Sequence, residues 1–125
     1  MIKYIYTIKK KECLSLQEFR QHWDSDIFID SLIGVVETLG GTDLRRSLVL
    51  DVEFNKTLNE VRGEEDALYD AVIEYILPSA ASLLETLETD EFKERFAELE
   101  ALEEKFIDLK HSPRCFVEYF EPLID

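Results

Sequence analysis

The order of strand-like and helix-like segments constrains this chain more than any other feature of its sequence. Segments near residues 2–9, 44–54, 68–77 and 114–121 are rich in β-branched and aromatic residues, which favour strands. Helical periodicity follows the first and the third of them, whereas residues 55–65 are polar and are expected to form a loop or a ragged hairpin end. The order strand, helix, strand, strand, helix, strand predicts an α+β domain with one antiparallel sheet and its helices on one face.

The helical stretches begin at residues that commonly cap helices. Residues 15–18 read Ser-Leu-Gln-Glu, which is the pattern of a capping box. Apolar residues at three- and four-residue steps follow, and the stretch 27–36 either continues this helix or bends away from it. Ser79 and Asp90 are the predicted caps of a short helix and a longer one.

The first strand carries apolar side chains on both of its faces. Alternation places Ile2, Tyr4, Tyr6 and Ile8 on one face and Ile5 on the other. Helices on one side of the sheet cover only one of these faces. Because an uncovered apolar face usually marks an interface, the strand pattern predicts a homodimer in which a second copy covers the other face.

Length and charge exclude several classes of protein. The 125 residues fit a single domain over residues 1–125, and the net charge of −14 disfavours nucleic acid and anionic membranes as partners. No stretch approaches the ~20 apolar residues of a membrane span, and no signal peptide is recognised at the start. The two cysteines match no metal spacing, so a cytoplasmic chain with reduced thiols is expected, with Cys115 buried in the last strand.

Several segments resemble one known family. Residues 14–23, Leu-Ser-Leu-Gln-Glu-Phe-Arg-Gln-His-Trp, resemble the first helix of EthD-like proteins of the dimeric α/β-barrel superfamily. Residues 69–74 resemble the third strand of that family, and residues 104–108 and 115–118 resemble its last helix and strand. The resemblance implies a ferredoxin-like fold and a homodimer whose two sheets close into a barrel around a ligand-sized cavity.

Five polar residues are candidates for binding a small hydrophobic or aromatic ligand. Glu74 and Glu118 lie among apolar strand neighbours, where desolvation would raise the pKa of a carboxyl group. The alternative is that they face solvent or pair with a lysine. His22 could reach a cavity or lie on a helix surface beside a carboxylate, and Tyr4 and Tyr6 could line a pocket or belong to the dimer core.

Two classes of function fit this pattern. One is an enzyme that transforms an aromatic or polyketide-like compound without a cofactor. The other is a non-catalytic dimer that binds a ligand or serves as a stress-related accessory protein. Members of the family commonly carry a His where Ile27 stands and a Pro where Ile29 stands, and this difference favours the second class. No motif for a nucleotide, a phosphate, zinc or an activated serine occurs, so neither a cofactor nor a metal is expected.

Overall fold

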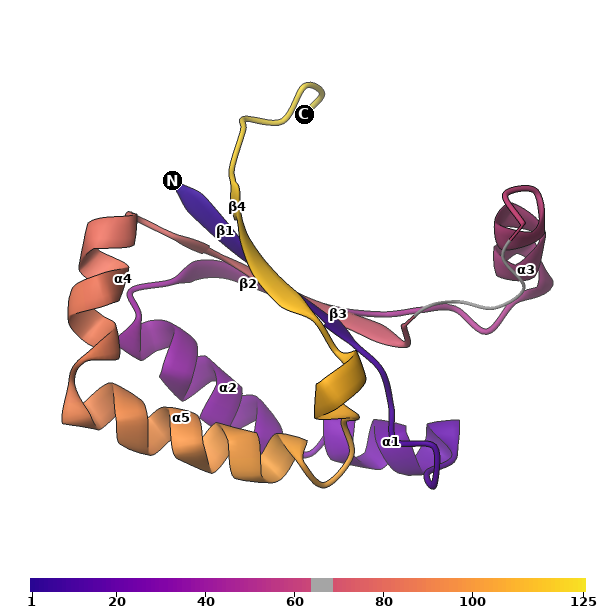
Figure 1. Cartoon of the computed structure of the whole chain (residues 1–125), viewed down its shortest axis with the longest axis horizontal. Coiled ribbons are helices and arrows are strands. Elements are labelled where there is room, and N and C mark those ends of the chain that lie inside the picture. The colour runs from indigo at the N-terminus through magenta and orange to yellow at the C-terminus, as the bar shows by residue number, and fades with distance from the viewer. Residues whose placement is uncertain (64–68) are drawn as a thin grey trace.

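The computed structural model describes residues 1–63 and 69–125 and contains a four-stranded antiparallel sheet with helices packed on one face (Figure 1). The predicted α+β, ferredoxin-like architecture is therefore confirmed. The order of strands across the sheet is β2-β3-β1-β4, which places the first and third strands at its centre. The strands are β1 (Ile2–Ile8), β2 (Thr42–Leu48), β3 (Ala71–Leu77) and β4 (Arg114–Glu118).

The helices form the second layer, apart from one that stands away from it. Helices α2 and α5 lie side by side beneath the sheet, with α1 and α4 at the two ends of this layer (Figure 1). The core lies between the layers and is built largely of aromatic and branched aliphatic side chains. The helices are α1 (Leu16–Trp23), α2 (Asp26–Thr38), α3 (Glu53–Glu60), α4 (Ala80–Leu87) and α5 (Asp90–Glu103), followed by the 3-10 turn η1 (Leu109–His111).

Most of the predicted caps are present. Ser15 and Glu18 form the capping box at the start of α1, and Ser79 caps α4. The chain bends after Trp23, so the stretch 27–36 belongs to a separate helix, α2. The prediction of Asp90 as the cap of α5 is wrong, because the hydroxyl of Thr89 accepts from the amide of Phe92.

The predicted second strand is wrong beyond residue 48. Leu48 pairs with Ala71, the first residue of β3, so β2 has no partner strand beyond this point. Val52 caps α3, and the predicted loop over residues 55–65 is wrong through Glu60, where α3 ends. Residues 64 and 65 of that loop lie outside the described residues.

The remaining strands end earlier or start later than predicted. Strand β3 begins at Ala71, and residue 68 of the predicted segment lies outside the described part of the chain. Strand β4 ends at Glu118, three residues before the predicted end. Strand β1 matches its prediction within one residue.

The two faces of the sheet differ in what covers them. The inner face packs on the helices and carries Tyr4, Tyr6, Ile73 and Tyr75, among other residues. The open face bears the alternate residues and has no covering layer among the described residues (Figure 1). Its members are Lys3, Ile5, Thr7, Arg45, Ser47, Val72, Glu74, Ile76, Cys115 and Val117. The expectation of a buried Cys115 is wrong, since this thiol is exposed on β4.

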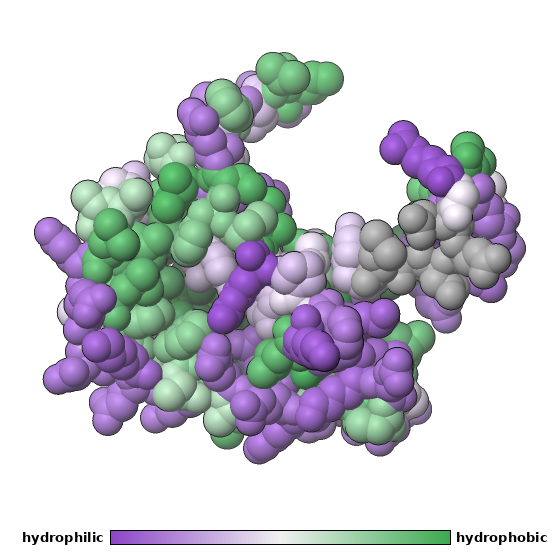
Figure 2. All heavy atoms as spheres, in the orientation of Figure 1, coloured by the Kyte–Doolittle hydropathy of each residue, from purple (hydrophilic) through white to green (hydrophobic). Residues whose placement is uncertain are grey.

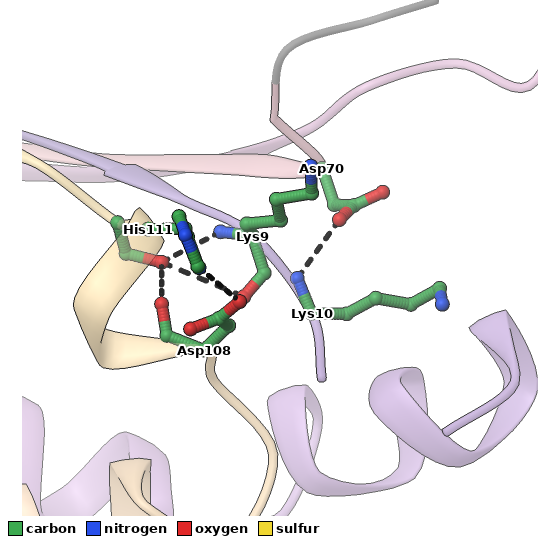
Figure 3. A network of polar contacts seen from close by, with 6 residues as sticks. Lys9, Lys10, Asp70, Asp108 and His111 are labelled. Carbon is green, nitrogen blue, oxygen red and sulfur yellow. Dashed lines mark hydrogen bonds and ion pairs between the residues drawn. The ribbon is translucent and has the colours of Figure 1, made fainter. Parts of the chain in front are cut away.

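A polar network fastens the end of β1 to the segments on either side of it (Figure 3). The amide of Lys9 donates to Ser112 Oγ at 2.8 Å, and the amide of Lys10 donates to Asp70 Oδ2 at 2.8 Å. His111 Nδ1 lies 2.8 Å from Asp108 Oδ2, and this contact lowers the pKa of the Asp108 carboxyl. Because most of these bonds involve backbone groups, we assign the network a structural role: it joins the end of β1 to the segments around Asp70 and Ser112.

None of the helices in the described ranges has the length and apolar character needed to cross a bilayer.

Candidate functional site

Three tyrosines gather on the inner face of the sheet. Tyr4 and Tyr6 point the same way because side chains two residues apart on a strand share a face. Antiparallel pairing of β1 with β3 places Tyr75 opposite Tyr4, and their rings stack with centroids 4.7 Å apart. The ring of Tyr6 meets that of Tyr4 edge-on at 6.3 Å. The result is an aromatic floor that faces α2 and α5.

Helix α5 places a carboxyl group against this floor. Glu103 is its last residue and is only 3 % exposed, which is rare for an acidic side chain. Its Oε2 atom has no hydrogen-bond partner among the described residues. The position follows from the helical repeat, since Phe92, Phe96, Leu99 and Glu103 are spaced by four, three and four residues and share one stripe.

Burial shifts the proton equilibrium of this carboxyl towards neutral pH. Desolvation raises the pKa of Glu103 from 4.5 to about 7, while interactions with the Tyr6 hydroxyl and Arg114 act in the opposite direction. The same burial raises the pKa of Tyr4 to about 12 and raises those of Tyr6 and Tyr75 further. The tyrosines therefore stay protonated as donors, and Glu103 is the group that exchanges a proton near pH 7.

Arg114 forms the outer boundary of the site. It starts β4 and pairs with Tyr6 across the β1–β4 ladder. Its guanidinium lies 5.9 Å from the centroid of the Tyr6 ring and 5.5 Å from that of Phe96. On the solvent side, Nη2 is 3.5 Å from Glu100 Oε1, and both side chains are about two-fifths exposed. Arg114 thus connects the buried tyrosines to the surface of α5.

These residues enclose a cavity of about 20 Å³ between the sheet and helices α2 and α5. Tyr4, Tyr6, Tyr75, Glu103 and Arg114 supply its polar groups, and the rest of its lining is apolar. A cavity of this size holds about one water molecule. A larger ligand requires side chains to move, and those at the edge strand β4 are the most exposed.

Larger hollows lie on the surface, and two of them adjoin β2 or the segment that follows it. A cleft of about 410 Å³ runs between α2 and β2, where Arg46 Nη1 donates to the carbonyl of Trp23 and its guanidinium lies 4.8 Å from the Trp23 ring. A groove of about 460 Å³ lies beside α1 and the segment that follows β2. Neither contains a buried ionisable group that compares with Glu103.

The structure brings together two of the five predicted site residues. Tyr4 and Tyr6 line the cavity. Glu74 lies on the open face and forms an ion pair with Lys3, with Nζ and Oε2 3.3 Å apart. His22 stacks on the ring of Phe106 at 5.2 Å, away from the cavity, and Glu118 is exposed on β4.

Sequence reasoning missed three members of the site. Tyr75 lies on β3 and lines the cavity, but it was not among the five candidates. Arg114 carries no sequence signal of its own. Glu103 had a signal that went unused, because a carboxyl on the apolar stripe of a helix is an exception to the amphipathic pattern.

Comparisons with known proteins bear on the fold. No family model and no curated protein matches the sequence. Solved structures do match, and they support the ferredoxin-like fold of this chain. One of them, an EthD family protein from Bacillus halodurans, has a TM-score of 0.60 at 16 % identity and covers 96 % of this chain and 99 % of its own.

Two further structures extend the range of functions found on this fold. A dimeric ferredoxin-like protein of unknown function from Bacteroides fragilis has a TM-score of 0.53 at 10 % identity, covering 94 % of this chain and 93 % of its own. SnoaB, a cofactor-independent oxygenase from Streptomyces nogalater, has a TM-score of 0.53 at 11 % identity, covering 99 % and 97 %. At these identities the likeness establishes the fold alone.

Proposed function

We propose that this chain is a homodimer in which each copy binds a small aromatic or polyketide-like molecule beside Glu103 and transfers a proton to or from it without a cofactor. The observation that carries the proposal is a carboxyl group, 3 % exposed, whose pKa is raised to about 7 inside an aromatic cavity. A group with this pKa is poised to act as both acid and base at neutral pH.

The surrounding residues suit such a step. In its ionised form Glu103 accepts a proton from a C–H or O–H group of the ligand and becomes the neutral acid. The negative charge left on the ligand then needs hydrogen-bond donors, and the neutral hydroxyls of Tyr4 and Tyr6 lie in the lining of the same cavity. SnoaB offers a precedent for cofactor-free chemistry on this fold.

A second candidate function is binding without catalysis. The closed cavity of about 20 Å³ supports it, because a carrier has to open to admit its ligand but needs no reacting group. Ile27 in place of the histidine common in the family also supports it. Under this alternative, Glu103 orients the ligand by a hydrogen bond.

The experiment that separates the two functions uses 1,3-dihydroxynaphthalene, an aromatic enol, as a probe. Binding is followed by quenching of Trp and Tyr fluorescence, and proton transfer by deuterium exchange of ring hydrogens in D2O. For an enzyme, Glu103→Gln lowers the exchange rate at least about tenfold. The control Glu98→Gln, which is exposed on the same helix, keeps most of the rate.

Each outcome has one reading. Binding without exchange above the uncatalysed rate supports the carrier. Exchange that Glu103→Gln leaves unchanged removes Glu103 from the mechanism. Absence of binding of this probe and of related naphthols and quinones rejects the aromatic ligand.

The homodimer is proposed from the open face. Ile5, Val72, Ile76 and Val117 lie there half-buried within one chain and would be covered by a second sheet. A protein of the same fold is described as dimeric, which supports a dimer without saying which face forms it. The cytoplasmic location stays a prediction.

A further inference from the structure

Helix α3 is amphipathic but has no core to pack on. Phe54, Leu58 and Val61 recur at steps of four and three residues and form one stripe. Their exposed fractions are 68 %, 53 % and 82 %, and no residue of the helix is buried in the described structure. Figure 1 shows α3 at the end of an arm (residues 49–63), clear of the two layers and not on the side of α2 and α5.

A helix in this situation needs a partner surface. An isolated helix of eight residues is marginal in water even with good helix formers, since its few hydrogen bonds do not offset the cost of nucleation. The connecting residues Leu50 and Val52 are exposed as well, at 68 % and 45 %. Figure 2 shows hydrophobic residues on this projecting arm.

The area of the open face bears on whether a dimer interface would also include the arm. From strand spacing and rise, four strands of five to seven residues span roughly 19 by 20 Å, on the order of 400 Å² in projection. A standard interface buries about 800 Å² on each partner. The exposed stripe of α3 adds apolar area beside this face and increases what a second copy could bury.

The distribution of charge also favours contact between α3 and the open face of the sheet. The chain as a whole carries −14, yet its open face holds two cations, Lys3 and Arg45, for one carboxylate, Glu74. Helix α3 carries Glu53 and Glu60 against one lysine. A mildly acidic helix is thus better placed on the mildly basic sheet face than on the acidic remainder of the molecule.

We propose that the α3 arm of each copy packs its apolar stripe, Phe54, Leu58 and Val61, against the open-face side of a second copy of this chain. By two-fold symmetry the contact occurs twice, once for each arm. The inference rests on the proposed homodimer and names the element that completes its interface. It leaves the cavity beside Glu103 unaffected.

The test compares two double variants by sedimentation equilibrium. Phe54→Ser with Leu58→Ser removes two of the three stripe residues, whereas Lys56→Arg with Asn59→Ser changes the opposite side of the same helix and keeps its charge. We expect the first pair to raise the dimer dissociation constant at least about tenfold and the second to change it less than about threefold. Because α3 contributes nothing to the core, neither pair should unfold the monomer.

Amide hydrogen exchange of the unmodified chain supplies an independent readout. The amides of α3 should be protected at concentrations where the dimer forms and exchange rapidly after dilution to the monomer. If both variants have the same dimer dissociation constant and the α3 amides are unprotected, the proposed contact of α3 is wrong. The proposed homodimer is unaffected by that result. A monomer at all concentrations overturns the homodimer and the arm together.

Discussion

At the scale of single residues, the proposed site depends on one departure from an ordinary pattern. Glu103 occupies the helix position that an apolar residue would fill, and its side chain is enclosed by the aromatic floor of Tyr4, Tyr6 and Tyr75. A neutral carboxylic acid fits such a site much better than a carboxylate. The raised pKa of Glu103 therefore couples the stability of the fold to pH, and this coupling can be measured.

Glu103→Gln should remove that coupling. The pKa is about 7 in the folded chain against 4.5 for an ordinary glutamate, so the folded state binds more protons between these values. Stability from Glu103 is then fully present below about pH 4.5 and is lost as pH rises through 7, up to about 3 kcal/mol. We expect the glutamine variant to gain stability relative to the unmodified chain between pH 4 and pH 8. Urea unfolding across this range measures the difference, and parallel curves would contradict the assignment.

Arg114→Gln should raise the pKa of Glu103 above its present value. The guanidinium charge favours the carboxylate form, so its removal favours the neutral acid. Carbon-13 NMR of the glutamate carboxyl groups follows this titration directly. Arg95→Gln is the matched control, since Arg95 pairs with Glu91 on the surface of α5. Equal pKa values in the two variants would exclude Arg114 from the electrostatics of the site.

At the scale of elements, local signals account for most helix ends. Helix α2 ends in a Schellman motif, in which the amide of Gly41 donates to the carbonyl of Val36 and that of Gly40 to the carbonyl of Glu37. Gly40 has a φ of 71°, a conformation that side chains with a Cβ rarely adopt. This glycine directs the chain from α2 into β2.

Gly40→Ala should therefore destabilise the fold through backbone strain. A Cβ at this position meets no atom within 4 Å, so packing contributes nothing to the effect. We expect the free energy of unfolding to fall by about 1 kcal/mol, measured by urea denaturation. Gly40→Asn should cost less, because asparagine tolerates the left-handed region better. An alanine variant as stable as the unmodified chain would show that the turn relaxes.

At the scale of the whole molecule, the open face is the surface proposed for assembly. The ion pair of Lys3 and Glu74 and the apolar residues around it are accessible in one copy and would be enclosed in a dimer. The two free cysteines give a direct probe of this difference. Cys115 lies on the open face, whereas Cys13 is exposed in the turn before α1.

Alkylation by iodoacetamide should distinguish these thiols. In the dimer Cys115 is covered and should react slowly, and dilution below the dissociation constant should speed it up. Cys13 should react at the same rate at every concentration, which makes it an internal control. Mass spectrometry of the two peptides measures both rates in one sample. Equal rates for Cys115 at high and low concentration would place the dimer interface elsewhere.

The sequence by itself determined the elements whose signals are local. Alternation identified β1, the Ser-Leu-Gln-Glu pattern identified the start of α1, and the order of segments identified the fold. It also identified Tyr4 and Tyr6 as residues of one face. These features depend on neighbours along the chain, and such neighbours are visible in the sequence.

Tertiary structure alone decided how far β2 extends and which residues meet. Residues 48–54 alternate like a strand, but β3 begins at Ala71, and after the bond from the amide of Val49 to the carbonyl of Asp70 the chain leaves the sheet and forms α3. Glu74 and Glu103 are both acids near apolar neighbours in the sequence. Packing left Glu74 on the open face beside Lys3 and enclosed Glu103 among the tyrosines, and burial by distant segments is what sets the pKa of Glu103.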